Sequence, residues 1–324
     1  MITIKEAITK KELKTFVKFP FKLYKGSKYW VPPIISEELK TFNKRINPVF
    51  ENAEAHFFLA YKNKKVVGRV AAIINWIEVK DQNIKKMRFG WFDVIDDIEV
   101  TKSLINKVTE IGKAHGLELL EGPMGFSNLD KVGCVTKGFD QIANMITWHN
   151  YEYYPEHFKQ LGFEIGKHYL ESKMDFSDIH PKSFRKIQSL IKRRYKLTEV
   201  GFTNNKDIIP YTDEMFDVFS KSHAKLSSFV EISEKQKVYF KKKFIPFLTP
   251  EYVKFVKDEN GKLIAFAIVT PFFGEALQKM NGRLFPFRFR HLLRAKKKHD
   301  KITFYLIGIL PEYQNKGVTS IIFN

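Results

Sequence analysis

Cysteine is almost missing from this sequence, which has a single one, Cys134, in 324 residues. One thiol excludes an intramolecular disulfide framework and any metal site built from several cysteines. The nine histidines are scattered without the spacing of metal ligands, so we expect no metal. This composition favours a reducing, cytoplasmic location, and it favours a small buried side chain over a nucleophile as the role of Cys134.

Long apolar runs are missing as well. The longest, LIAFAIVTPFF (Leu263–Phe273), is too short to cross a bilayer, and the N-terminal stretch MITIKEAITKKELKTF lacks the apolar core of a signal peptide. We therefore expect no membrane span. Hydrophobic residues nevertheless make up 44% of the chain and aromatic residues 15%, which suffices for packed cores in two domains of ordinary size.

Acidic residues are scarce in the second half of the chain. Residues 176–324 hold 28 Lys and Arg against 14 Asp and Glu, whereas residues 1–175 hold 27 against 22. A net charge of +19 favours polyanionic partners, which include nucleic acid, anionic lipid and phosphorylated cofactors. A solubilising surface also explains this charge, and for the charge alone we prefer that interpretation.

Two stretches, 195 residues apart, have the same pattern of two strands joined by a polar turn. They are AYKNKKVVGRVAAIIN (Ala60–Asn75) and FVKDENGKLIAFAIVT (Phe255–Thr270). A third strand follows each hairpin, FGWFDVID (Phe89–Asp96) in the first half and ITFYLIGIL (Ile302–Leu310) in the second. A repeat of this length predicts two copies of one domain.

The first half continues as an alternation of helices and strands. Periodicity predicts a helix over Glu99–Gly116, a strand over Leu117–Met124, a short helix within Tyr153–Glu164 and a strand over Tyr169–Phe176. This order predicts an α/β fold with a mixed sheet. We expect a first domain over residues 1–176, a linker with a basic amphipathic helix over 177–196, and a second domain over 197–324.

The last strand is followed by LPEYQNKGVT, in which a loop leads into a helix near Gly317 and Val318. A helix N-terminus presents free backbone N–H groups and the positive end of the helix dipole. Gly317 would allow close approach of a ligand, and Lys316 adds a positive charge. A phosphate group would be bound well there, although an ordinary strand-to-helix connection also fits.

The same stretch resembles the coenzyme A signature of the GCN5-related N-acetyltransferases (GNAT), Gln/Arg-x-x-Gly-x-Gly/Ala, with Thr319 in place of the final small residue. The segment from Tyr154-Pro155 to Leu161-Gly162-Phe163 resembles a late helix-to-strand element of that family. The closest type is a bacterial group with two GNAT domains in tandem. The resemblance implies two tandem GNAT-like domains, of which the second is incomplete at its C-terminus.

The resemblance also implies a reaction, the transfer of an acyl group from acetyl-coenzyme A or another acyl-coenzyme A to an amine of a small molecule or peptide. It implies a cofactor site made of Ile307, Ile309, Leu310, Gln314, Asn315, Lys316, Gly317, Val318 and Thr319. The N–H of Ile309 would stabilise the oxyanion. Candidates for the proton acceptor are His299, Asp300 and Tyr305, and none is preferred. The family's usual general acid would lie beyond Asn324.

The first half departs from the signature. Asp93, Asp96, Asp97 and Glu99 stand near the start of its helix, where carboxylates stabilise the helix dipole but repel a pyrophosphate. We therefore interpret the first copy as degenerate, with a structural or substrate-positioning role.

Two basic stretches, Lys182–Lys196 and Arg283–Lys301, keep other functions open. They would suit a nucleic-acid-binding protein, an anionic membrane surface, or a tRNA-dependent aminoacyl transferase on the same tandem fold. A solvated helix face and a loop would also explain them, and for the basic stretches alone we prefer that interpretation. The Gln314–Gly317 turn, which tRNA-dependent transferases generally do not need, favours acyl-coenzyme A. The oligomeric state is not readable from the sequence.

Overall fold

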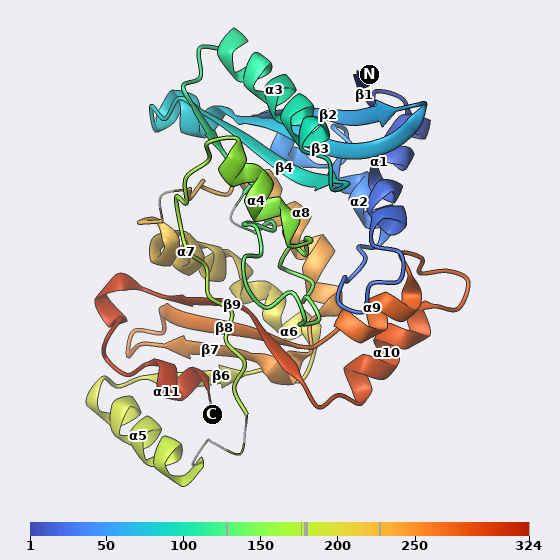
Figure 1. Ribbon diagram of the computed structural model, residues 1–324. Coiled ribbons are helices and arrows are strands. Elements are labelled where there is room, and N and C mark those ends of the chain that lie inside the picture. Colours follow the sequence, from blue (N-terminus) through green and yellow to red (C-terminus); the bar gives the residue numbers. More distant parts are fainter. Residues whose placement is uncertain (128, 176, 178–180, 227, 324) are drawn as a thin grey trace. The chain divides into compact units, whose positions relative to one another are not determined.

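The computed structural model describes residues 1–127, 129–175, 177, 181–226 and 228–323, and it divides into two compact units (Figure 1). The first unit comprises residues 1–169 together with 273–297. The second comprises 170–272 and the chain from 298 onward. The predicted end of the first domain at Phe176, positions 178–180 of the predicted linker and the final Asn324 lie outside the described residues.

The first unit is built on a five-stranded mixed sheet in the order β1-β2-β3-β4-β5. The first four strands pair antiparallel, and β4 pairs parallel with β5 only over its first three residues, Lys86–Arg88. The strands are β1 (Ile2–Glu6), β2 (Ala53–Lys62), β3 (Lys65–Asn75), β4 (Lys86–Val94) and β5 (Leu119–Glu121).

Helices cover both faces of this sheet. α3 packs on β1, β3 and β4, and it shares one apolar cluster with α4 (Figure 1). A separate cluster contains Phe16 and Val17 of α1 and Phe42, which directly follows α2. These helices are α1 (Lys10–Leu23), α2 (Ile35–Thr41), α3 (Ile98–Ala114) and α4 (Tyr153–Gln160), with short turns at Pro48–Glu51 and Ile77–Asp81.

The second unit repeats this plan around a four-stranded antiparallel sheet in the order β6-β7-β8-β9. Its strands are β6 (Thr198–Gly201), β7 (Val253–Lys257), β8 (Leu263–Pro271) and β9 (Ile302–Ile309). Its helices are α5 (Pro181–Arg194), α6 (Asn205–Ile208), α7 (Thr212–His223), α8 (Glu234–Phe244) and α11 (Thr319–Ile322), with short turns at Ile209–Tyr211, Ile245–Phe247, Pro250–Tyr252 and Pro311–Tyr313.

The predicted repeat is visible in the irregularities of the two sheets. The second strand of each hairpin has a bulge at an equivalent place. The bulged residue, which has no partner in the register of the first strand, is Val67 in β3 and Ile264 in β8. The chain beyond the third strand then donates to that bulged residue, from Ile95 N to the Val67 carbonyl (3.0 Å) and from Leu310 N to the Ile264 carbonyl (2.9 Å). Val94 in β4 therefore corresponds to Ile309 in β9.

The second copy carries an insertion between its second and third strands. This insertion holds α9 (Gly274–Met280) and α10 (Phe289–Lys297), and it belongs to the first unit. The Gln278 side-chain amide donates to the backbone carbonyls of Lys28 (2.8 Å) and Trp30 (3.1 Å), and the fully buried Met280 packs in a cluster with Val31. The second sequence repeat therefore contributes a segment to the first unit, which the linear order of the repeats did not predict.

Most predicted elements are confirmed, and one is wrong. The sequence predicted a strand over Tyr169–Phe176, but the described part of this segment is irregular, and Leu170 is 94% exposed. Its apolar residues have no sheet partner there. The predicted strand Leu117–Met124 is shortened to β5, since Gly122 and Pro123 interrupt it. Among the described residues, no helix has both the length and the apolar character that crossing a bilayer requires.

Candidate functional site

The connection from β9 to α11 contains the residues predicted to bind a cofactor. In the described part of the chain, β9 is one of the two edge strands of its sheet. Because Leu310 N–H donates toward β8, strand alternation turns the N–H and C=O groups of Ile309 and Ile307 to the opposite, open edge. The Ile309 carbonyl accepts a hydrogen bond from Gln314 Nε2 (3.1 Å), which folds the turn back against the strand end.

The turn that follows presents several unpaired backbone donors. Gly317 has φ of +74°, a conformation that favours glycine, and within the described residues the N–H groups of Gly317, Val318 and Thr319 donate to no acceptor. Val318 is buried and Thr319 is exposed. On its other side Gly317 approaches α5 so closely that a Cβ would lie 3.1 Å from Ile191 Cδ1. A side chain at position 317 would therefore disturb both the turn and its packing.

Lys316 and Asn315 complete the polar surface of the turn. The Lys316 ammonium lies 5.0 Å from the ring centroid of Tyr313 and 5.4 Å from that of Tyr195. Two aromatic faces hold a cation by their quadrupoles while leaving it free to contact an anion. Asn315 is exposed with φ of +61°. The turn thus combines free N–H groups with one fixed positive charge.

The predicted proton acceptors are not gathered at this turn. His299 and the exposed Asp300 precede β9, and at about 3.3 Å per residue they lie roughly 35 Å along the chain from Leu310. His299 Nε2 is 3.0 Å from the Tyr252 hydroxyl. Tyr305 lies within β9 at its bulge, with its ring 6.0 Å from that of Phe244.

Sequence reasoning missed Ser222 and His223, which end α7 beside β9. A Cβ on Gly308 would lie 3.0 Å from Ser222 Oγ. His223 Nδ1 is 3.0 Å from the Phe219 carbonyl, and the tautomer that donates this bond leaves a lone pair on Nε2. Burial lowers the pKa of His223, which keeps the ring neutral at pH 7. A glycine inside the apolar run ITFYLIGIL was the available signal for this close approach.

The first copy fills the equivalent edge with its own side chains. Val94 N–H donates to the Tyr154 hydroxyl (2.9 Å), and the Val94 carbonyl accepts from the Tyr153 hydroxyl (2.6 Å). Asp97, one of the predicted acidic residues, caps α3 by accepting from Glu99 N (3.1 Å). The strand edge and the helix start that would hold a ligand are therefore both occupied.

A buried ion pair lies close to this occupied edge in the first copy. Arg69 Nε donates to Asp93 Oδ2 (2.7 Å), and the two side chains are 3% and 9% exposed. The Tyr24 hydroxyl donates to the other Asp93 oxygen (2.9 Å), and burial together with this carboxylate raises the pKa of Tyr24 well above its usual value. By the register of the two sheets, Arg69 and Asp93 correspond to Phe266 and Gly308, so the second copy has no charge at this place.

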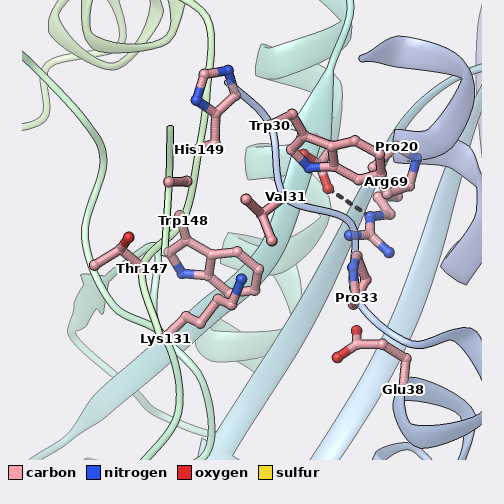
Figure 2. Close-up of a pocket in the computed structure, with 12 residues that line it drawn as sticks. Pro20, Trp30, Val31, Pro33, Glu38, Arg69, Lys131, Thr147, Trp148 and His149 are labelled. Carbon is pink, nitrogen blue, oxygen red and sulfur yellow. Dashed lines mark hydrogen bonds and ion pairs between the residues drawn. The ribbon is translucent and has the colours of Figure 1, made fainter. Parts of the chain in front are cut away.

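A small polar pocket lies beside that ion pair in the first unit (Figure 2). Its volume of about 30 Å³ gives room for about two water molecules, too little for a coenzyme. Lys131 extends into it with its ammonium 5.3 Å from the Trp148 ring centroid, and no carboxylate of the described chain lies within 4.0 Å of that ammonium. Burial lowers the pKa of Lys131, while Glu38 and Asp93 partly oppose the shift.

Two histidines and the cysteine of the first unit are wholly or partly buried, and burial shifts the pKa of His149 and of Cys134. Burial and the nearby Lys131 lower the pKa of His149 to about 4. His157 is buried with Nδ1 2.9 Å from the Thr101 hydroxyl. Burial raises the pKa of the Cys134 thiol to about 12, which keeps the thiol protonated at pH 7 and disfavours a role as a nucleophile. In the described ranges, no three His, Cys, Asp or Glu side chains gather as metal ligands.

The pocket allows a test of how the charge of Lys131 affects the pKa of His149. Replacing Lys131 with methionine should raise the pKa of His149 from about 4 toward its ordinary value, because one of its two causes is removed while burial remains. Titration of the His149 ring protons by NMR measures this shift. Lys137→Met, at an exposed position of the same segment, should leave the titration unchanged. A parent His149 that titrates near 6.5 would contradict the described pocket.

Comparisons with known proteins were made at the level of sequence and of structure. No family model matches the chain. Protein YghO of Escherichia coli is 24% identical over 322 residues, which cover 98% of this chain and 81% of that protein. A protein named bacterial ceramide synthase, from Caulobacter vibrioides, is 24% identical over 311 residues, which cover 94% of this chain and 80% of that protein.

The solved structures extend the likeness to the fold. A GCN5-related glucosamine N-acetyltransferase region of a fungal multi-domain β-N-acetylglucosaminidase aligns with all of this chain and 33% of its own, at 13% identity and a TM-score of 0.51. A tandem GNAT protein from the clavulanic acid pathway also aligns with all of this chain and 83% of its own, at 11% identity and a TM-score of 0.47. Together with the repeated sheets, the first alignment confirms the expectation from LPEYQNKGVT: the chain has the GNAT fold, in two consecutive copies.

Proposed function

We propose that this protein is an acyl-coenzyme A-dependent N-acyltransferase whose donor site lies in the second copy. The observation that supports this most is the contrast between the two third strands. Val94 of the first copy already bonds Tyr153 and Tyr154, whereas in the second copy the Ile309 N–H lies at an open edge and the Ile309 carbonyl accepts from its neighbour Gln314. Directly after that edge comes a turn with free N–H groups and a lysine.

The residues of the second copy suit the two ends of a coenzyme. The N–H groups of Gly317, Val318 and Thr319, with Lys316 and the neighbouring Gln314 and Asn315, would hold the pyrophosphate. The open edge from Ile307 to Leu310 would pair with the amides of the pantetheine arm. Bound in this way, an acyl-coenzyme A supplies an acyl group that is activated toward amines. The Ile309 N–H is the donor we propose for the acyl carbonyl oxygen.

The acceptor amine must lose a proton during transfer. His223 meets the chemical requirement, because it is neutral at pH 7 and follows Ser222, which packs against Gly308 of β9. Tyr305, the only earlier candidate within β9, lies four residues before Ile309, or about 13 Å along the strand. We therefore propose His223 ahead of Tyr305, His299 and Asp300 as the proton acceptor.

For the acceptor we propose the amine of a long-chain amino alcohol. The relative named ceramide synthase matches 94% of this chain, and a ceramide is such an amino alcohol acylated on nitrogen. The fungal region named for glucosamine shares the fold alone. Acyl transfer forms one amide C–N bond and breaks the thioester C–S bond. One amine proton passes to the base, and coenzyme A leaves as a thiolate that takes up a proton from the base or from water, so that the free thiol is released.

Coenzyme binding tests the donor site. Gly317→Glu should weaken binding of acetyl-coenzyme A at least about tenfold, or about 1.4 kcal/mol, because it places a carboxylate against the pyrophosphate in a strained conformation. Isothermal calorimetry on the full chain measures the affinity. The matched control is Gly261→Glu, which adds the same charge at φ of +77° in the turn between β7 and β8.

The control separates loss of the site from loss of the fold. Gly261→Glu should bind like the parent, and circular dichroism should show both variants folded. Equal binding by Gly317→Glu and the parent would refute the donor site, as would the absence of heat with a folded parent protein.

Product analysis tests the acceptor class. Incubated with an acyl-coenzyme A, the protein should form the N-acyl product of sphinganine, detected by mass spectrometry, much faster than that of glucosamine. Serinol, which has a 2-amino-1,3-diol and no long chain, is the matched control and should react slowly. Faster acylation of glucosamine or serinol would contradict the proposed long-chain acceptor.

A further inference from the structure

We propose that the inserted segment of the first unit is a docking surface for an anionic membrane. The surface consists of the turn with Phe285 and Phe287 and the outward face of α10 with Arg290, Leu293 and Arg294. Its binding to a membrane requires no acyl transfer, but if the proposed function holds, it would bring the protein to the lipid phase that contains long-chain amines.

Charge is the first support for this surface. Residues 276–299 contain eight Lys and Arg and no Asp or Glu. Within the described ranges, the cations of Arg283, Arg290, Arg294 and Lys297 have no carboxylate within 4.0 Å. A row of cations without internal counterions matches the negative potential of a bilayer rich in anionic lipid.

Exposed apolar side chains are the second support. Phe285 is 74% exposed, Phe287 64% and Leu293 52%. The inner face of the same segment is packed, since Leu292 contacts the cluster of Leu277 and Met280. Arg290 lies over the Phe287 ring at 5.3 Å and shares a helix face with Leu293 and Arg294. The cations and the apolar groups therefore form one continuous surface, as in helices that lie at a membrane interface.

These side chains favour lipid over nucleic acid. Leu293 has no aromatic face on which a base could stack, and Arg290 already covers one face of Phe287. Burial in hydrocarbon, in contrast, would remove all three apolar groups from water. A nucleic acid would satisfy only the charges.

Vesicle flotation without any acyl-coenzyme A tests the proposal. The full chain should float with vesicles of equal parts phosphatidylglycerol and phosphatidylcholine, should not float with pure phosphatidylcholine, and should bind less as salt is raised. Arg290→Gln/Arg294→Gln should weaken binding at least about tenfold. Lys10→Gln/Lys11→Gln, the same change of charge at two exposed positions of α1, should bind like the parent.

A second variant distinguishes a membrane from a polyanion. Phe285→Ser/Phe287→Ser should lose vesicle binding while its affinity for a single-stranded oligonucleotide stays the same. The proposal is overturned if the parent does not float with anionic vesicles, if the α1 variant loses as much binding as the α10 variant, or if Phe285→Ser/Phe287→Ser floats normally. Coenzyme binding, measured separately, is unaffected by any of these outcomes.

Discussion

The outer edge of each third strand must satisfy its backbone N–H and C=O groups, and the two copies meet this requirement in opposite ways. In the first copy, two tyrosines of α4 bond both polar groups of Val94. In the second copy, as far as the described residues show, the Ile309 carbonyl accepts a hydrogen bond from Gln314 and the Ile309 N–H has no such partner at the outer edge. One fold thus yields a closed edge and an edge that remains available for an extended ligand.

The two copies also differ at the positions beside this strand edge. Arg69 and Asp93 place a buried charge pair in the first copy, which Tyr24 stabilises by a further hydrogen bond. A buried pair of this kind is costly to break, because the remaining charge would be left without compensation. The second copy has Phe266 and Gly308 there, and the glycine lets Ser222 approach the strand. The first copy thus has a charge pair beside its third strand, whereas the second has Ser222 and the Phe266 ring there.

Local chemistry made much of the fold predictable. The hairpins and the α3 helix depend on turn residues and on apolar spacing, all within a few neighbouring positions. The Gln314–Gly317 turn was visible for the same reason. Long-range events were not. Nothing near Tyr153 or Tyr154 reveals that their hydroxyls reach Val94, and nothing near Gln278 reveals that this amide bonds a loop about 250 positions earlier.

The central claim is that only the second copy offers a strand edge to an acyl-coenzyme A. Hydrogen–deuterium exchange with and without acetyl-coenzyme A tests it most directly, because it reports on both edges in one experiment. We predict slower exchange over residues 307–319 and no change over residues 92–94. Slower exchange at Val94 and in α4, with residues 307–319 unchanged, would contradict the claim and assign the donor site to the first copy.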